Sequence, residues 1–475
     1  MKNKYSLLLS NTIIFGLGNL LVKLISFFLM PLYTSVLTAE EYGIAELLNS
    51  SIEIILPIAS LCIVEALYRF SIDEDQNHDI LFANSLIITF AGDILVLIIS
   101  FIIYKLFNYQ YSFEFALLYI CISFYKIVIQ FARGLGHTKK YAFYGVLNTL
   151  LLFLSNYILL VIYKGGISAY LLSFSISYGI TGIIAFIVSK EYKFLHFKKY
   201  NKKVMKEMLK YSLPGIPNML SWWVNNVSDR YIILLFYGSG MAGLYTAASK
   251  LPSMINVFTS VFQQAWQYST SKEIASKDNS IFFSNVFKIY SFGCTFLCLL
   301  LITFNKFICF IILKEEFYVA WKFVPILLLA ATFGCFSTFF GTFYNALKNN
   351  KMLMISTIIG AGTNIILNMI LIPLFGGLGA AVATAISYLV IVLIRIKNIQ
   401  KYIKLNINKE NLIIKILILI ICSISASFTN SSVIYYICIV SLLILVIMDF
   451  NTLKLIINKT LNFIKSKLKN KKAII

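Results

Sequence analysis

Several ionisable side chains lie inside apolar stretches that are long enough to cross a membrane. Lys23 and Glu53 fall in the first and second of these stretches, and Asp229, Arg230 and Lys250 fall in the seventh and eighth. A charged side chain at the centre of a bilayer costs about 3 kcal/mol on insertion scales, so it usually faces a hydrated cavity or pairs with another charge. Lys23, Arg230 and Lys250 are too deep to reach the headgroups easily, and we expect them to line a cavity.

The sign of these charges indicates the kind of solute. A cleft lined mainly by Lys23, Arg230 and Lys250, with Glu53 beside them, favours an anion because low-dielectric walls strengthen the attraction. Arginine binds a phosphate through a planar fork, and lysine binds it as a point charge. Phosphate and pyrophosphate headgroups are therefore the expected ligands. For Asp229 the sequence leaves two roles open, in the site itself or as the neutralising partner of a basic residue on a facing helix.

Other ionisable residues have a simpler interpretation. Glu46 and Glu65 lie near the ends of the second apolar stretch, and Lys288 lies near the end of the ninth. We expect these three side chains to reach the headgroups or to form structural ion pairs.

The elements that hold these residues are membrane-spanning helices. The chain has 475 residues, of which 59% are hydrophobic and 13% are charged, and its mean hydropathy is +0.83. A soluble domain is nearer a quarter charged. The apolar stretches predict an all-α, polytopic membrane protein with about fourteen spans, the first over roughly 10–35.

The second half of the chain repeats the first weakly. Asn156 aligns with Asn368, and Gly43 aligns with Gly243. Two such halves with a path between them are the usual architecture of a transporter.

The repeat divides the chain into three parts. Residues 1–200 form a six-helix lobe with a basic linker, 201–400 form a second six-helix lobe, and 401–475 add two helices and a basic tail. Because six is even, both lobes enter the membrane from one side, and the axis that relates them follows the membrane normal. Pro57 and Pro252 lie at comparable depths in the two lobes and predict helix breaks.

Charge predicts the orientation. Most of the 41 Lys and Arg fall in the loops and tails that share a side with the amino terminus, above all in the 190–210 linker and beyond 454. We therefore expect the chain to lie in the cytoplasmic membrane. By the positive-inside rule, both of its termini are on the cytoplasmic side. Most of the net charge of +21 therefore serves to orient the chain in the membrane. We expect no nucleic-acid partner, because no compact basic domain exists to bind one.

Catalytic patterns are missing from the sequence. His78, His137 and His196 fall in predicted inner loops, and none has a second ligand at metal-binding spacing. No phosphate-binding glycine motif is present, and no outer loop is large enough to hold an acceptor site. All eight cysteines lie in predicted spans, where packing is their expected use. We therefore expect no enzyme activity, no metal and no cofactor.

Short motifs resemble a known family. They are Asn11–Asn19, Pro31–Thr34, Glu41–Gly43, Gly134–Lys139, Ser249–Pro252 and Gly377–Ala381. In order and spacing over nearly the whole chain, they resemble the polysaccharide-biosynthesis flippases of the oligosaccharide-lipid, O-antigen type, which belong to the multidrug/oligosaccharidyl-lipid/polysaccharide exporter superfamily.

This resemblance implies a twelve-helix core with two extra helices, and transport by alternating access. It also implies that an undecaprenyl-diphosphate-linked oligosaccharide moves from the inner to the outer leaflet while its polyprenyl tail stays in the lipid. Partners would be this polyprenyl-diphosphate-linked glycan, the membrane lipid, and a polymerase or other glycan-assembly proteins.

The related lipid II flippases have a sodium site, and the matching candidates here are Asp229, Asn364, Asn368 and Thr384. Asn364 and Asn368 are one helical turn apart and share a face. Asn368 stands where the pattern has a second carboxylate, so Na⁺ would bind weakly or the site would be absent. Polar contacts that hold the helices together are the competing interpretation of these residues. The coupling ion, Na⁺ or H⁺, is left open.

Three other functions remain open. A cation-coupled small-solute or drug antiporter of the same superfamily fits the fold, although a cationic cleft disfavours cationic drugs. A lipid II flippase fits as well. A membrane polymerase of the same pathway would need a large outer loop with paired acidic residues, which the sequence lacks.

Overall fold

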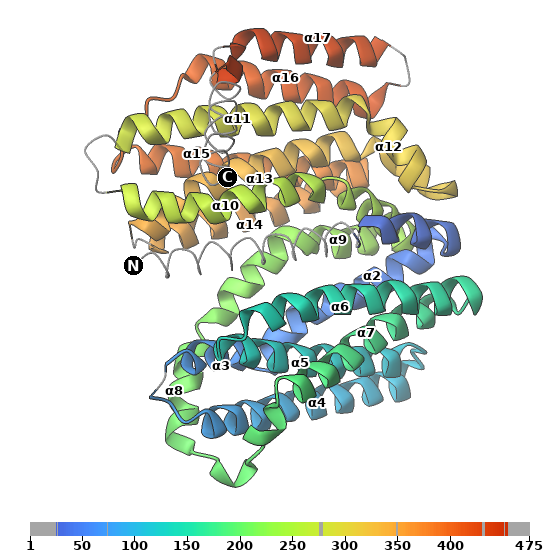
Figure 1. Cartoon of the computed structure of the whole chain (residues 1–475). Coiled ribbons are helices and arrows are strands. Elements are labelled where there is room, and N and C mark those ends of the chain that lie inside the picture. The colour runs from blue at the N-terminus through green and yellow to red at the C-terminus, as the bar shows by residue number, and fades with distance from the viewer. Residues whose placement is uncertain are drawn as a thin grey trace, which may run out of the picture. The chain divides into compact units, whose positions relative to one another are not determined.

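The computed structural model describes residues 25, 27–73, 75–274, 279–347, 350–429, 433–450 and 452–454. These residues form helices and turns without a strand (Figure 1). Eleven of the described helices are long and apolar enough to cross a membrane, and Phe27–Val36 and Val433–Met448 are shorter apolar helices. The all-α membrane fold is thus confirmed. Lys23 and most of the first predicted span lie outside the described residues.

The chain divides into two compact units. One comprises Met1–Thr246 with Ile312–Phe317, and the other comprises Ala247–Ile311 with Tyr318–Ile475. The first unit therefore continues well beyond residue 200, because most of α9 (Gly215–Lys250) packs within it. The three-part division drawn from the repeat stays a prediction.

The first unit is built on α2 to α8 and most of α9. The bounds are α2 Ala39–Ala59, α3 Ile63–Ser71, α4 His78–Phe107, α5 Ser112–Gly134, α6 Thr138–Asn156, α7 Gly166–Val188 and α8 Lys202–Ser212. Helix α5 packs against α3, α4 and α7, and α7 also packs against α6 (Figure 1). A short π-helix, Tyr157–Ile162, extends α6, and two 3₁₀ turns, Glu191–Phe194 and Phe197–Lys199, lead into α8.

The second unit is centred on α13. The bounds are α10 Ser253–Glu273, α11 Asn279–Thr303, α12 Asn305–Ile312, the 3₁₀ helix Glu315–Lys322, α13 Val324–Ala346, α14 Asn350–Phe375, α15 Gly377–Ile399, α16 Lys409–Phe428 and α17 Val433–Met448. Helix α13 packs against α10, α11, α15 and α16. Its Phe339 stacks on Trp266 of α10, with ring centres 4.5 Å apart, and its carbonyl accepts the indole N–H at 3.2 Å. This aromatic packing forms the core of the unit.

Local sequence sets where the helices of the first unit begin and end. Thr38 and Glu41 form a reciprocal capping box at the start of α2, which satisfies two otherwise unpaired backbone N–H groups. The helix ends two residues after Pro57, at a turn in which Leu61 and Cys62 take positive φ of 52° and 53°. Ser212 donates to the carbonyl of Leu61 at 2.8 Å and so holds this turn.

The second predicted helix break is also present. Helix α9 ends at Lys250, directly before Leu251 and Pro252, and α10 starts at Ser253. Both proline-marked interruptions are therefore confirmed. Within α9, Gly238 has a non-helical φ of 81°, which separates the predicted seventh span from the eighth. Only glycine adopts this conformation without strain.

Candidate functional site

Helices α2 and α9 cross at two glycines that the repeat aligns. A β-carbon on Gly43 would overlap the carbonyl oxygen of Ser239, and one on Gly243 would overlap the carbonyl oxygen of Ala39. Each glycine would also place that carbon 2.9 Å from the backbone nitrogen of the other. The crossing uses small residues four apart on both helices, which lets their backbones approach closely. This contact places the side chains that follow on α2 next to those of α9.

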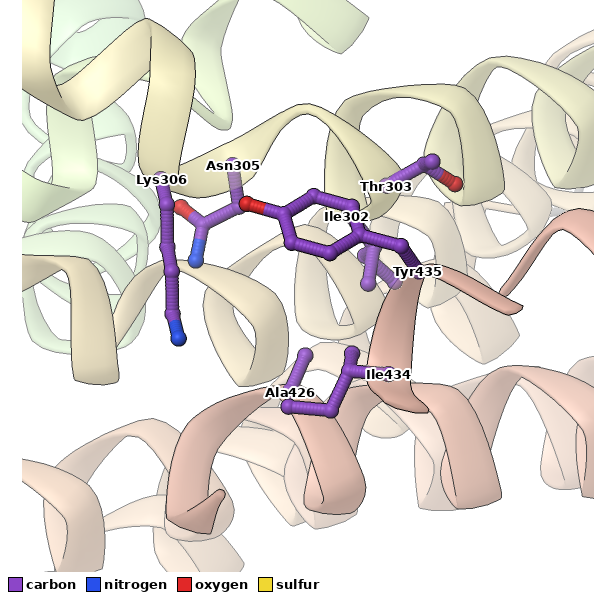
Figure 2. Close-up of a pocket in the computed structure, with 7 residues that line it drawn as sticks. All are labelled: Ile302, Thr303, Asn305, Lys306, Ala426, Ile434 and Tyr435. Carbon is purple, nitrogen blue, oxygen red and sulfur yellow. The ribbon is translucent and has the colours of Figure 1, made fainter. Parts of the chain in front are cut away.

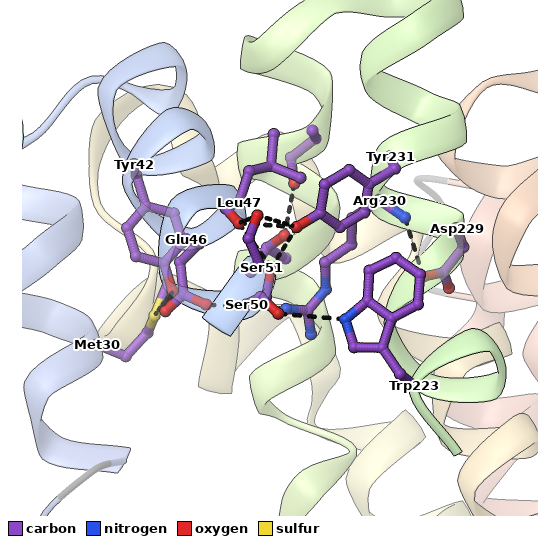
Figure 3. A network of polar contacts seen from close by, with 12 residues as sticks. Met30, Tyr42, Glu46, Leu47, Ser50, Ser51, Trp223, Asp229, Arg230 and Tyr231 are labelled. Carbon is purple, nitrogen blue, oxygen red and sulfur yellow. Dashed lines mark hydrogen bonds and ion pairs between the residues drawn. The ribbon is translucent and has the colours of Figure 1, made fainter. Parts of the chain in front are cut away.

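A buried carboxylate lies one turn further along α2. Glu46 is 5% exposed, and its Oε1 accepts from the hydroxyls of Tyr170 at 2.8 Å and Tyr42 at 3.2 Å. Its Oε2 lies 3.8 Å from Nη1 of Arg230 on α9. Of the two roles expected of Glu46, the structure shows the ion pair. Arg230 is its partner, and the two side chains neutralise each other in the first unit (Figure 3).

Tyrosines and an asparagine extend this network. Tyr33 packs against the rings of Tyr42 and Tyr170, with ring centres 5.9 Å and 5.0 Å apart. The Nδ2 of Asn156 donates to the Tyr33 hydroxyl at 3.1 Å. Glu46 is therefore enclosed by phenol rings whose hydroxyls replace water around its charge.

Two aromatic residues of α9 form hydrogen bonds with backbone carbonyls of α2. Tyr231 donates to the carbonyl of Leu47 at 2.8 Å, and its hydroxyl lies 2.7 Å from Oγ of Ser51. The indole N–H of Trp223 donates to the carbonyl of Ser50 at 3.2 Å (Figure 3). These bonds fix the register of α9 against α2, and with it the position of Arg230.

Asp229 is next to Arg230 but faces other groups. It is 5% exposed, and its Oδ2 accepts from the Tyr245 hydroxyl at 2.5 Å. Its Oδ1 accepts from the backbone N–H of Arg230 at 3.0 Å. Both carboxylate oxygens thus have hydrogen-bond donors within α9, which stabilises the charge of Asp229 in place.

The other residues of the predicted cationic cleft are Glu53, Lys250 and Lys23. Glu53 is exposed on α2, about two turns beyond Glu46. Lys250 is half-buried, is the last residue of α9, and belongs to the second unit. Lys23 lies outside the described residues. The predicted cleft therefore stays a prediction.

Three of the four cation-site candidates come together in the second unit. Nδ2 of Asn368 donates to Oδ1 of Asn364 at 2.9 Å, and Nδ2 of Asn364 donates to Oγ1 of Thr384 at 3.3 Å. Asn368 is fully buried, and its Oδ1 has no hydrogen-bond partner among the described residues. These ligands are all neutral. The oxygen left for a cation is Oδ1 of Asn368. The fourth candidate, Asp229, is part of the first unit.

Several buried ionisable residues were not singled out from the sequence, among them Arg395 and Lys415. Arg395 of α15 donates to Ser337 and Ser356 at 2.7–3.0 Å and to Thr357 at 3.0 Å. Lys415 of α16 lies 2.5 Å from Asp449. Arginine and lysine are common at the cytoplasmic ends of spans. From sequence alone, Arg395 and Lys415 therefore cannot be distinguished from residues that only orient the chain.

A small cavity of about 10 Å³ beside Lys306 and Tyr435 has room for about one water molecule (Figure 2). Among the described residues, no three His, Cys, Asp or Glu side chains gather as metal ligands would. The eight cysteines are free thiols.

Comparison with known proteins gives a consistent set of relatives. A family model described as polysaccharide biosynthesis protein matches residues 8–267, which is more than half of the chain. The probable low-salt glycan biosynthesis flippase Agl15 of Haloferax volcanii is 27% identical over 236 residues, which cover 48% of each protein. The match thus spans about half the length of this curated relative.

Solved structures share the fold. The lipid II flippase MurJ in an inward closed conformation has a TM-score of 0.68 at 16% identity, over 93% of this chain and all of that one. An inward-facing multidrug resistance transporter of the MATE family has a TM-score of 0.61 at 14% identity, over 82% of this chain and 95% of that one. At these identities the likeness concerns the fold alone.

Proposed function

Because this chain belongs to the polysaccharide biosynthesis protein family, we propose that it is a flippase for a lipid-linked oligosaccharide. Its cargo is an undecaprenyl-diphosphate-linked repeat unit, which it moves from the inner to the outer leaflet of the cytoplasmic membrane. The match over 8–267 carries this proposal, because it includes every described element of the α2–α9 crossing. The name of the Haloferax volcanii relative, a glycan biosynthesis flippase, supports the same class of cargo.

The buried ion pair suggests how the diphosphate is handled. Arg230 lies 3.8 Å from Glu46, which is longer than a charge-assisted hydrogen bond of about 2.8 Å. Glu46 is also held by Tyr42 and Tyr170, so it keeps two donors when Arg230 moves away. In our proposal Arg230 exchanges Glu46 for the diphosphate of the cargo when the anion enters, and returns to Glu46 when the anion leaves. We propose that this exchange accompanies alternating access.

The other proposed ligands and the coupling ion rest on the sequence. Lys23 and Lys250 would add point charges for the diphosphate, and Glu53 would accept hydrogen bonds from sugar hydroxyls. The amide oxygen of Asn368, with Asn364 and Thr384, would hold Na⁺ weakly, because these neutral oxygens lack the charge that a second carboxylate would supply. If no Na⁺ binds there, H⁺ is the alternative coupling ion.

A lipid II flippase is the second candidate. The fold of MurJ covers 93% of this chain, whereas the MATE transporter covers 82%. Both cargoes carry a polyprenyl diphosphate, and the proposed role of Arg230 is the same for either. The small-solute antiporter is supported by fold in the same way, through the MATE transporter with its TM-score of 0.61, which covers less of this chain.

Depletion of the protein tests the proposed cargo. Lipids would be extracted from depleted cells, and polyprenyl-diphosphate-linked glycans would be quantified and assigned to a leaflet with an impermeant glycan-binding probe. A complete repeat unit accumulating on the inner leaflet is expected. Accumulated lipid II would indicate the second candidate, complete units on the outer leaflet would indicate a polymerase, and no accumulation would indicate the antiporter.

A further inference from the structure

A cavity of about 570 Å³ lies within the second unit, where α11 and α16 begin and α17 ends. Its lining includes two lysines, Lys288 and Lys415, and the asparagines Asn285, Asn406 and Asn411, while no lining residue is acidic. Pockets that bind small molecules commonly measure about 300–1,000 Å³. The cavity is therefore large enough for a small polar ligand.

Hydrogen bonds build the wall of this cavity. Oγ of Ser280 donates to the carbonyl of Lys404, and the backbone N–H of Asn406 donates to Oγ of Ser284 at 2.9 Å. Asn408 then caps α16 by accepting from the N–H of Asn411 at 3.0 Å. The segment between α15 and α16 is thus tied to α11, which keeps the polar side chains around the cavity in place.

The lining of the cavity carries a net positive charge. Lys415 is 1% exposed, and its charge is balanced by Asp449 at 2.5 Å. Lys288 is exposed and has no carboxylate partner among the described residues. The lining therefore keeps one uncompensated positive charge, and amide and hydroxyl donors surround it. A cation would be repelled by the uncompensated charge of Lys288, and an apolar ligand would leave the asparagines unpaired.

We propose that this cavity binds a phosphate-bearing anion. Lys288 supplies the charge, and the amides of Asn285 and Asn411 supply N–H donors to the phosphate oxygens, as phosphate sites in proteins commonly require. The volume exceeds that of one phosphate group and accommodates a glycerol phosphate as well. The proposal is separate from the transport function, because Arg230 and its partners take no part in it.

Two sources could supply this chemistry. The candidate membrane spans Ser280–Thr303 and Lys409–Phe428 begin at the cavity, so it lies where a span meets the headgroup region. The phosphodiester headgroup of an anionic lipid reaches this depth directly. A soluble phosphate ester reaches it from the water.

Binding to the purified full chain tests the proposal. The chain in detergent would be titrated with short-chain phosphatidylglycerol, with sn-glycerol 1-phosphate, and with short-chain phosphatidylcholine, whose headgroup carries no net charge. The variants are Lys288→Glu and the near-isosteric Asn285→Asp, both at exposed positions, where we expect the fold to be retained. Lys401→Glu is the matched control, an exposed lysine just beyond the end of α15 that does not line the cavity.

We expect saturable binding of phosphatidylglycerol that Lys288→Glu and Asn285→Asp each weaken by roughly tenfold or more, and that Lys401→Glu leaves unchanged. Equal binding of sn-glycerol 1-phosphate with the same dependence on Lys288 would support the site and identify a soluble ester as its source. Binding of phosphatidylglycerol alone would identify the lipid. The proposal is overturned if neither anion binds saturably, or if Lys401→Glu weakens binding as much as Lys288→Glu.

Discussion

Gly43 and Gly243, which the internal repeat aligns, lie in direct contact where α2 crosses α9. The contact is reciprocal. The carbonyl oxygen of Ala39, four residues before Gly43, packs against Gly243, and that of Ser239, four residues before Gly243, packs against Gly43. Such reciprocity is expected of equivalent residues beside a two-fold axis. The contact gives the weak sequence repeat a physical counterpart within the first unit.

Substitution at this crossing should destabilise the protein. We expect Gly43→Ala and Gly243→Ala each to lower the free energy of unfolding by about 1–3 kcal/mol, because the added methyl overlaps a backbone carbonyl that has little room to move. Gly240→Ala on the same helix is the control, since no atom lies within 4 Å of the place its β-carbon would take. Thermal unfolding in detergent measures all three. Equal midpoints for Gly43→Ala and Gly240→Ala would show that the crossing is loose.

Loss of Arg230 should abolish transport. Arg230→Ala removes the planar fork that we assign to the diphosphate, and Arg230→Lys keeps the charge but not the fork. We expect transport to fall at least roughly tenfold in both, with the alanine variant also less stable because the buried Glu46 loses its ionic partner. Arg69→Ala, which breaks a surface ion pair with Asp73, is the control. Normal transport by Arg230→Ala would contradict the proposed exchange.

The other predicted cationic residues, Lys23 and Lys250, can be tested in the same way. Lys23→Ala and Lys250→Ala should each reduce glycan export while insertion into the membrane is retained, because each removes one point charge from the proposed path. Lys351→Ala, at an exposed lysine of α14, is a suitable control. Export rates and membrane content would be measured together. Unchanged export in both variants would restrict the anion site to Arg230.

Stability should depend on pH through Glu191. This side chain is fully buried before α8, neither carboxylate oxygen has a partner among the described residues, and burial raises its pKa to about 9 although Lys140 opposes the shift. Between its ordinary pKa of 4.5 and about 9, the folded chain keeps a proton that the unfolded chain releases. Stability therefore falls as the pH rises through this window, by about 3 kcal/mol at most near pH 7.

Glu191→Gln should remove this dependence. We expect its unfolding midpoint to exceed that of the unaltered chain at about pH 8 and to approach it at about pH 5. Glu207→Gln changes an exposed glutamate of α8 and should leave the profile as it is. A profile for Glu191→Gln parallel to that of the unaltered chain would show that Glu191 is ionised in the folded state.

A carboxylate at position 368 should strengthen cation dependence. Asn368→Asp would supply the negative charge that the neutral oxygens of Asn364 and Thr384 lack, so transport should become more dependent on Na⁺. Asn156→Asp is the control, because Asn156 aligns with Asn368 in the repeat and is equally buried. Transport would be measured in Na⁺ and in choline buffers. The same response in both variants would argue against a cation site at α14 and α15.

The sequence predicted the helical membrane fold because a span needs only length and apolar composition. It also predicted that Asn364 and Asn368 share a face, since residues four apart on one helix are neighbours whatever packs around them. It did not predict which acid pairs with Arg230. Glu46 precedes it by well over a hundred residues, and the pair depends on how α2 and α9 cross, which periodicity does not encode.

The limits of the first unit show the same effect. The repeat predicts a boundary near 200, whereas the compact units follow contacts: Tyr231 and Trp223 bond the backbone of α2 and join most of α9 to the first unit. Repeats record how a chain was duplicated, whereas compact units record which side chains meet. Contacts between distant segments therefore determine the compact units, but they do not determine the repeat.

Translocation by the purified full chain tests the central claim most directly. It would be reconstituted into vesicles that carry a polyprenyl-diphosphate-linked oligosaccharide, and an impermeant glycan-binding probe would follow the appearance of the glycan in the outer leaflet. We predict transfer by the unaltered chain and by Arg69→Ala, and loss of transfer in Arg230→Ala. Transfer no faster than in protein-free vesicles, or equal transfer by Arg230→Ala, would contradict the account.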